Sequence, residues 1–121
     1  MRAVVGGFAE GEGGSSATLG SLLLGLWHGG DLRFVGAVGS GFRDQALLAI
    51  RASLGELERD TSPFQPPVHY PGRLHWVEPG IVVDVEFKEW TADSHLRAPV
   101  YKGVEIADAS EVTWENEGPL S

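Results

Sequence analysis

The sequence contains no cysteine, and lysine occurs only twice, at Lys88 and Lys102. Without cysteine the chain can form no disulfide, has no thiol nucleophile and cannot build a thiolate zinc site. The longest unbroken apolar run is Ala46–Ile50, far short of the ~20 residues that span a membrane. The apolar stretch after Met1 is also too short for a signal peptide. We therefore expect no membrane association and a cytoplasmic location.

Positive charge is scarce and unevenly placed. The chain carries nine Lys and Arg against 17 Asp and Glu, which gives a net charge of −8. Five of these acids follow Lys102, the last basic residue, so residues 105–121 form an acidic tail behind a mildly acidic body. Phosphate affinity comes mainly from Lys and Arg, so the composition argues against strong independent nucleic-acid binding but allows a weak DNA-facing patch. By charge alone, removal of the tail should tighten such binding at low salt.

The chain length and composition predict one domain over residues 1–121. Its hydrophobic content of 42% is sufficient for a packed core, whereas 17 glycines and seven prolines argue against an all-helical fold. Short apolar or alternating runs between turn residues predict five strands, over residues 3–8, 19–27, 32–38, 81–90 and 96–104. Alternation within the third places Val35 on the same face as Arg33, opposite Leu32 and Phe34. The segment His28-Gly29-Gly30-Asp31 predicts a hairpin turn.

Between the third and fourth strands the hydrophobic period changes. Leu47, Ile50, Leu54 and Leu57 are spaced three, four and three residues apart, which predicts an amphipathic helix that begins near Asp44. Asp44 suits the N-cap or the first turn. Residues 61–72 hold four of the seven prolines and predict an extended loop. Beyond residue 108 no apolar period predicts a further element.

The predicted order is three strands, a helix and two strands, which is typical of a small closed β-barrel. It matches the OB-fold, a mainly β, five-stranded Greek-key barrel with its helix between strands three and four. The helix should close one end of the barrel through Leu47, Ile50 and Leu54. An SH3-like barrel is the alternative, but it leaves a helix of this length unexplained.

Signatures of catalytic and metal sites are missing or incomplete. Ser40 lacks the Gly-x-Ser-x-Gly elbow, and the glycine clusters have neither dinucleotide spacing nor a Walker lysine. His69 and His75 match no compact ligand motif, so no metal site is predicted. Asp84 and Glu86 share a strand face, an arrangement more typical of a solvated sheet than of acid–base catalysis. Four tryptophans would stack on nucleic-acid bases only where exposed, and packing roles are favoured: Trp27, Trp76, Trp90 and Trp114.

Seven stretches, in order and with similar gaps over nearly the whole chain, resemble the C-terminal domain of bacterial ATP-dependent DNA ligases of the end-joining repair kind. They are residues 4–8, 20–25, 32–42, 57–64, 76–79, 85–91 and 96–103. The resemblance implies an OB-fold, in agreement with the element order, and a location in the bacterial cytoplasm. It also implies that the domain closes over a nucleotidyltransferase domain and clamps nicked or broken duplex DNA from the minor-groove side.

In such ligases the adenylated lysine lies in a Lys-x-Asp-Gly motif of the separate nucleotidyltransferase domain. Neither Lys88 nor Lys102 precedes that pattern. Because the nucleophile is missing, the chain alone is expected to form no ligase–adenylate. ATP and Mg²⁺ are implied only for a full ligase. This chain is either one domain of such a ligase or a free-standing relative of that domain.

The resemblance places duplex DNA and the nucleotide against this domain, and the DNA contacts are then expected among its nine Lys and Arg residues, on the sheet face and rim. Duplex DNA is expected to contact Arg33, Arg43, Lys88, Arg97 and Lys102, and the nucleotide is expected to contact Arg97 and Lys102.

The family's final motif is matched only in its first half. That half is matched by Leu96, Arg97, Pro99 and Gly103. In the second half, Glu105 stands where the family has a basic residue and Asp108 where it has a lysine. Outside the motif, Ala37 stands where relatives often have an arginine. These acids would repel a triphosphate. Two functions therefore stay open: a DNA-clamping ligase domain, or a non-catalytic, ligase-derived OB module for binding or interaction.

Overall fold

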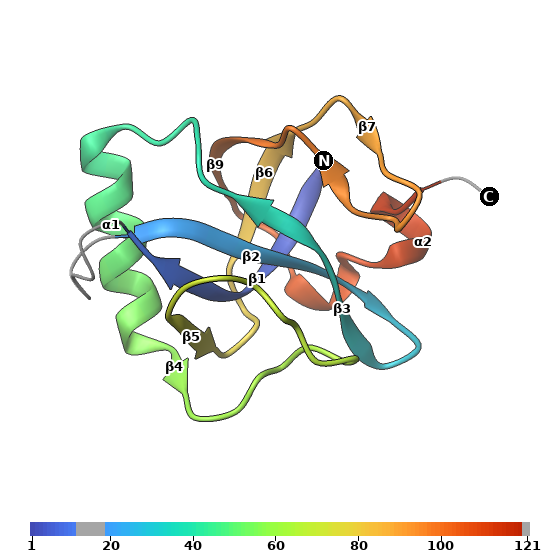
Figure 1. Ribbon diagram of the computed structural model, residues 1–121, viewed down its shortest axis with the longest axis horizontal. Coiled ribbons are helices and arrows are strands. Elements are labelled where there is room, and N and C mark those ends of the chain that lie inside the picture. Colours follow the sequence, from blue (N-terminus) through green and yellow to red (C-terminus); the bar gives the residue numbers. More distant parts are fainter. Residues whose placement is uncertain (12–18, 120–121) are drawn as a thin grey trace.

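The computed structural model (Figure 1) describes residues 1–11 and 19–119. The strands are β1 (Arg2–Glu10), β2 (Leu19–His28), β3 (Asp31–Val38), β4 (Glu58–Arg59), β5 (Leu74–Val77), β6 (Val82–Glu86), β7 (Glu89–Trp90), β8 (Leu96–Arg97) and β9 (Val100–Glu105). The helices are α1 (Asp44–Glu56), the 3₁₀ turn η1 (Ala109–Glu111) and the short α2 (Trp114–Glu117). In this part of the chain no helix is long and apolar enough to cross a membrane.

Strand β1 is the central strand of the sheet, because it pairs with three other strands. It pairs antiparallel with β2 along one edge, and along the other with β6 through its first half and β5 through its second. Strand β2 continues to β3, and β6 continues to β9. The Tyr101 N–H donates to the Ser40 carbonyl just beyond β3, at 2.9 Å, and joins the two ends of the sheet. With β5 and β6 together as the fourth strand, this is the predicted OB-fold.

The last two predicted strands are divided differently from the prediction. The fourth ends at Glu86, and its remainder pairs with the start of the fifth as a separate hairpin, β7–β8. The Lys88 N–H donates to the Arg97 carbonyl at 3.0 Å within this hairpin. Ala98, at φ 52°, and Pro99 then separate β8 from β9. The predicted strand over residues 96–104 is therefore two short strands with different partners.

The predicted hairpin between β2 and β3 is confirmed, and it contains one bulge. Gly29 and Gly30 both have positive φ, 59° and 89°, as a tight two-residue turn requires. Further along, Gly25 pairs with Phe34 and Leu24 with Gly36, so Val35 is an extra residue in β3. The prediction that Val35 shares the exposed face of Arg33 is wrong, because this bulge turns Val35 into the core.

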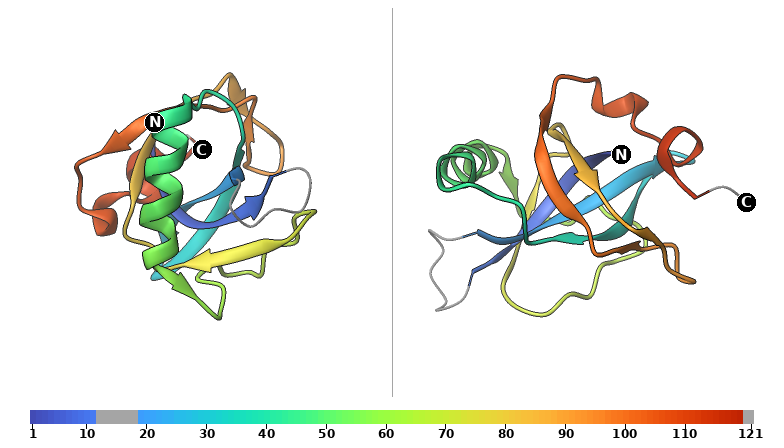
Figure 2. Two further views of the ribbon diagram at one scale, coloured as in Figure 1. Left: turned by 90° about the vertical axis from the view of Figure 1, so that its left-hand side faces the viewer. Right: turned by 90° about the horizontal axis from the view of Figure 1, so that it is seen from above.

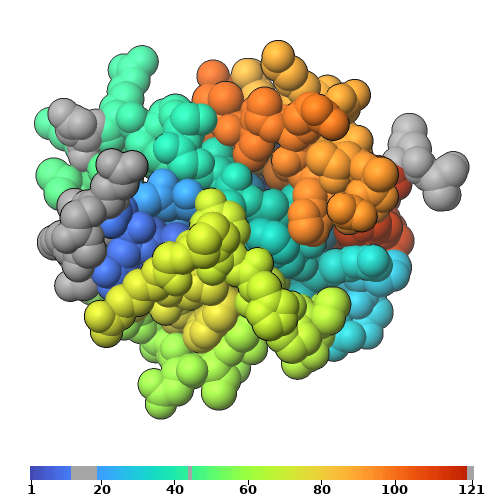
Figure 3. All heavy atoms as spheres, viewed as in Figure 1, coloured from blue at the N-terminus to red at the C-terminus, as the bar shows by residue number. Residues whose placement is uncertain are grey.

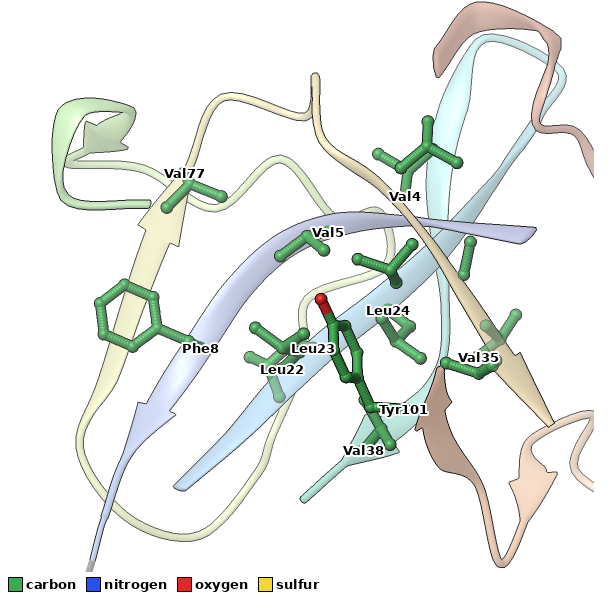
Figure 4. Close-up of a cluster of buried hydrophobic side chains, with 14 of the residues drawn as sticks. Val4, Val5, Phe8, Leu22, Leu23, Leu24, Val35, Val38, Val77 and Tyr101 are labelled. Carbon is green, nitrogen blue, oxygen red and sulfur yellow. The ribbon is translucent and has the colours of Figure 1, made fainter. Parts of the chain in front are cut away.

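Side chains from β1, β2, β3, β5 and β9 converge on one core (Figure 4). Helix α1 lies across one end of the barrel (Figure 2). Its Ile50 and Leu54 are buried, and Leu47 and Leu57 are half-buried, as the spacing predicts. Arg43 occupies the N-cap position without a side-chain cap bond, so the predicted Asp44 is the first helical residue.

We expect Ile50→Ala to lower the free energy of unfolding by about 2–5 kcal/mol, because the variant leaves a cavity between α1 and the barrel. Urea denaturation measures the change. The matched control is Leu48→Ala on the same helix, where the side chain is 68% exposed; a loss within ~0.5 kcal/mol is expected there. Equal losses in both variants would contradict the placement of α1.

The predicted loop at residues 61–72 carries a core residue. Phe64 is only 1% exposed, and the Gln65 N–H donates to the Leu32 carbonyl at 2.9 Å. The ring occupies a niche left by Gly6 and Gly25, since a Cβ at Gly6 would lie 2.5 Å from the Phe64 Cζ. The loop thus closes one side of the barrel although it contributes no long strand.

The segment beyond residue 108, where the sequence predicts no element, packs against the barrel. Val112 is fully buried, and its carbonyl accepts a hydrogen bond from the Trp27 N–H at 3.1 Å. The Glu117 carboxylate accepts from the Arg2 N–H at 2.8 Å. Residues 109–119 of the acidic tail are therefore part of the fold.

Candidate nucleic-acid interface

A shallow hollow of about 380 Å³ lies between β3, the proline-containing loop and the β7–β8 hairpin. In Figure 3 the β3 region is visible between the yellow-green loop and the orange hairpin. Strand β3 contributes Arg33 and Phe34, and the hairpin turn contributes Asp93 and His95. The His95 ring meets the Phe34 ring edge to face at 5.2 Å. The hollow therefore combines one cation and one carboxylate, Arg33 and Asp93, with aromatic surface.

The guanidinium of Arg33 is held by the C-terminal tail. Its Cζ lies 4.7 Å from the centre of the Trp114 ring, a cation–π contact. Trp114 in turn contacts Trp90 of the hairpin, with ring centres 6.1 Å apart. Sequence reasoning selected Arg33 but missed that Trp114 positions it. In the sequence, the hollow is indicated only by the arginine that precedes Phe34 in a predicted strand.

Lys88 and Arg97 lie on the β7–β8 hairpin beside this hollow, and both are exposed. Arg97 Nε is 2.9 Å from a carboxylate oxygen of Glu89, and both side chains are more than half exposed. Such an exposed pair contributes little stability, so a phosphate can replace Glu89 as the partner of Arg97 at small cost. Arg33 thus lines the hollow, and Lys88 and Arg97 lie on the hairpin whose turn forms part of its wall.

The other two predicted DNA contacts line a different depression. Arg43 and Lys102 border a groove of about 600 Å³ between α1 and β9. The Lys102 Nζ is 3.9 Å from a carboxylate oxygen of Glu86. The structure therefore does not bring the five predicted cations together at one hollow. The two predicted nucleotide contacts also lie on different strands, Arg97 on β8 and Lys102 on β9.

The altered end of the final motif has a structural role. Asp108 is the N-cap of η1, and its Oδ1 accepts hydrogen bonds from the Ser110 N–H at 3.0 Å and the Ser110 hydroxyl at 2.8 Å. These bonds lower the pKa of Asp108 below its ordinary value. Asp108 is thus a charged cap at neutral pH, and Glu105 is an exposed acid at the end of β9.

His75, on β5, lies between two carboxylates. Its Nε2 is 2.6 Å from a Glu10 carboxylate oxygen, and its Nδ1 is 3.4 Å from Glu58. Its ring also stacks on Phe8 at 4.7 Å. His69 instead borders the hollow, so the two histidines are not joined. Within residues 1–11 and 19–119 no group of three His, Asp or Glu residues could hold a metal ion.

The four tryptophans serve mainly in packing. All four are half-buried against the core, as the preference for packing roles predicts. Trp76 contacts the ring of Phe64, and Trp90 contacts Phe87. Base stacking by tryptophan is therefore not a prominent feature of the hollow.

The fold agrees with the comparisons to known proteins. The family described as "ATP dependent DNA ligase C terminal region" matches residues 15–106. The chain belongs to this family.

Among proteins of known sequence, the chain is similar to the multifunctional non-homologous end joining DNA repair protein LigD of Mycobacterium tuberculosis (strain ATCC 25618 / H37Rv). The two are 38% identical over 105 residues, which cover 84% of this chain and 14% of the relative. The LigD protein of Mycolicibacterium smegmatis is 37% identical over 115 residues, covering 93% and 15%. The LigD protein of Pseudomonas aeruginosa is 36% identical over 118 residues, covering 93% and 14%. The chain therefore spans about one seventh of these relatives.

Two solved structures share the fold. One is the ligase domain from M. tuberculosis LigD, with a TM-score of 0.83 and 36% identity over 93% of this chain and 37% of that chain. The other is mycobacterial DNA ligase D complexed with ATP and MES, with a TM-score of 0.77 and 34% identity over 93% and 36%. The chain thus corresponds to the C-terminal part of a bacterial ligase domain.

Proposed function

We propose that this chain is the DNA-clamping OB domain of an ATP-dependent DNA ligase of end-joining repair. It holds nicked or broken duplex DNA while a separate nucleotidyltransferase domain, over which it closes, forms the phosphodiester bond. The main supporting observation is that Arg33 lines a hollow whose wall includes the turn of the hairpin that carries Lys88 and Arg97, in a chain of the ligase family.

The position of these cations supports DNA contact. Strand β3 and the connection that contains β7–β8 correspond to the face and loop that OB-folds use for nucleic acids. Lys88 has no ion pair among the described residues and is exposed, so it is available to a phosphate. Contacts of this kind position a duplex without reading its sequence. A domain that serves nicks in any sequence requires that property.

The adenylation chemistry is assigned to the nucleotidyltransferase domain, which supplies the lysine and binds ATP and Mg²⁺. A mycobacterial relative is described as complexed with ATP. In this chain Arg97 and Lys102 are the cations proposed to approach the nucleotide on closure, and both are exposed. Glu105 and Asp108 supply no positive charge there, so a contribution to binding of pyrophosphate is correspondingly small.

We expect weak, salt-sensitive binding of the purified chain to a nicked duplex. Three phosphate contacts predict a slope of log K against log salt of about −3, at ~0.9 per contact. Fluorescence anisotropy at several salt concentrations gives the slope. Lys88→Gln should reduce its magnitude by about 1, whereas Arg43→Gln, in the other groove, should leave it unchanged. A folded chain that binds no nicked duplex at low salt would contradict the clamp.

That negative result would favour the second candidate, a non-catalytic OB interaction module. The specific observation for it is the use of Asp108 as a helix cap at a position where the family pattern has a lysine. Equal losses from Lys88→Gln and Arg43→Gln would indicate instead that the duplex spans both sides of the barrel.

A further inference from the structure

The groove between α1 and β9 is an opening in the barrel wall. Ala46, Ala49 and Ile50 line it from the helix, and Tyr101 and Val104 line it from the strand. Its volume of about 600 Å³ is within the range of sites that hold ligands or side chains of a partner. Most of this lining is apolar.

At Val104 the core side of the sheet is open to solvent in the groove. Val104 pairs directly with Val83 across the β6–β9 ladder, so both side chains point to the same face of the sheet. Val83 is completely buried there, whereas Val104 is 59% exposed. The adjacent Ile106 is fully exposed. An inward-facing valine without a cover indicates a missing apolar neighbour.

The edge of β9 along the groove is also unpaired. Among the described residues β9 pairs only with β6, and the hydrogen bond from Tyr101 to Ser40 is its last contact toward β3. From Lys102 to Glu105 the outer edge has no strand partner in this part of the chain. An exposed strand edge beside apolar pockets is a template for an added strand.

Side chains of opposite charge lie at the two ends of the groove. Arg43 stands at the beginning of α1 and Glu56 at its end, and both line the groove. Arg43 has no ion pair with any carboxylate whose side chain the structure describes, and Lys102 lies on the same groove. A carboxylate of an occupant is therefore favoured at the Arg43 end and disfavoured at the Glu56 end.

The Tyr101 hydroxyl adds a polar contact point. It has no hydrogen-bond partner among the described residues, and its residue lines the groove. A tyrosine hydroxyl is protonated at neutral pH, and burial raises the pKa of Tyr101 further, so this hydroxyl is a potential donor to an occupant.

We propose that this groove binds an extended peptide segment of a partner protein, which pairs as an added strand with the free edge of β9. Alternate apolar side chains of the segment cover Val104 and contact Ala49, and an acidic residue at one end pairs with Arg43. The site uses neither Arg33 nor the β7–β8 hairpin. It is therefore independent of the proposed contact with DNA.

Two synthetic hexapeptides test the proposal, acetyl-Asp-Val-Thr-Val-Thr-Ile-amide and acetyl-Ile-Thr-Val-Thr-Val-Asp-amide. Their opposite order covers both strand directions, and amide resonances of the ¹⁵N-labelled chain report binding. One of them should shift the resonances of residues 101–106 and of α1 at concentrations up to ~1 mM, where affinity is still measurable. The same peptide with proline at its centre should bind at least tenfold more weakly, because proline removes a backbone donor.

The matched variants are Ala49→Glu inside the groove and Leu48→Glu beside it on the same helix, where Leu48 does not line the groove. Ala49→Glu should weaken binding at least tenfold, and Leu48→Glu should leave it unchanged.

The absence of shifts with both peptides, or equal effects of both variants, would overturn the proposal. Concentration-dependent dimerisation that Ala49→Glu abolishes would also overturn it and identify a second copy of the chain as the occupant. Nicked-duplex binding by Ala49→Glu stays unchanged if the two sites are separate.

Discussion

Replacement of Phe64 by alanine will lower the free energy of unfolding by about 3–5 kcal/mol, the usual cost of an aromatic core truncation. Phe64 contacts the rings of Phe34 and Trp76 edge to face, with centres 5.6 and 6.1 Å away. The niche around it is formed by glycine backbone at Gly6 and Gly25. Strand backbone cannot collapse into the space of a lost ring without breaking its ladder, so most of the cavity will persist.

Chemical denaturation of Phe64→Ala measures this loss. The matched control is Tyr70→Ala, a half-buried aromatic residue of the same loop, whose hydroxyl lies 3.4 Å from the Ser21 hydroxyl. Its loss should be near ~1 kcal/mol, the average for a point substitution. If Tyr70→Ala costs as much as Phe64→Ala, the loop is held by its whole length and not by one anchor.

Truncation after Ile106 will destabilise the barrel by more than ~3 kcal/mol. It exposes the surface covered by Val112, whose burial contributes roughly 1.5–3 kcal/mol. It also removes the hydrogen bonds to the N–H groups of Trp27 and Arg2, at about 1 kcal/mol each. Relief of repulsion between the tail acids and other carboxylates works in the opposite direction but is weak at exposed sites.

The melting temperature of the truncated chain checks this expectation. A double variant, Glu111→Gln with Glu115→Gln, separates charge from packing, because both side chains are exposed. This variant should stay folded and bind nicked DNA more tightly at low salt, through reduced repulsion within a Debye length of ~10 Å. A truncated chain that melts at the unchanged temperature would show that the tail contributes only charge.

Much of the fold could be predicted from the sequence because its signals are local. The glycine pair at residues 29–30 sets the hairpin turn, and the spacing of Leu47, Ile50 and Leu54 sets the helix and its buried face. The order of these elements was sufficient for the OB-fold. The ligase resemblance also came from contiguous stretches, and the family match confirms it.

The candidate site was only partly predictable for the opposite reason. The sequence identifies Arg33 as a cation on a strand, but its contact with Trp114 joins residues about two thirds of the chain apart. The four-residue β5 and the two-residue β8 are too short to have a clear period. They form because β1 and β7 supply hydrogen-bond partners. Side-chain spacing could not foresee these pairings.

The sequence by itself determined the three N-terminal strands, the hairpin turn at residues 29–30 and the helix that follows, as well as the charged residues and the family that the chain resembles. Only the tertiary structure decided that Arg33 and the β7–β8 hairpin share one side while Arg43 and Lys102 border another groove. It also decided that the acidic tail packs on the barrel through Val112. The physical reason is that backbone conformation and amphipathic period depend on near neighbours in the chain, whereas burial and ion pairing depend on distances that exist only after the barrel has closed.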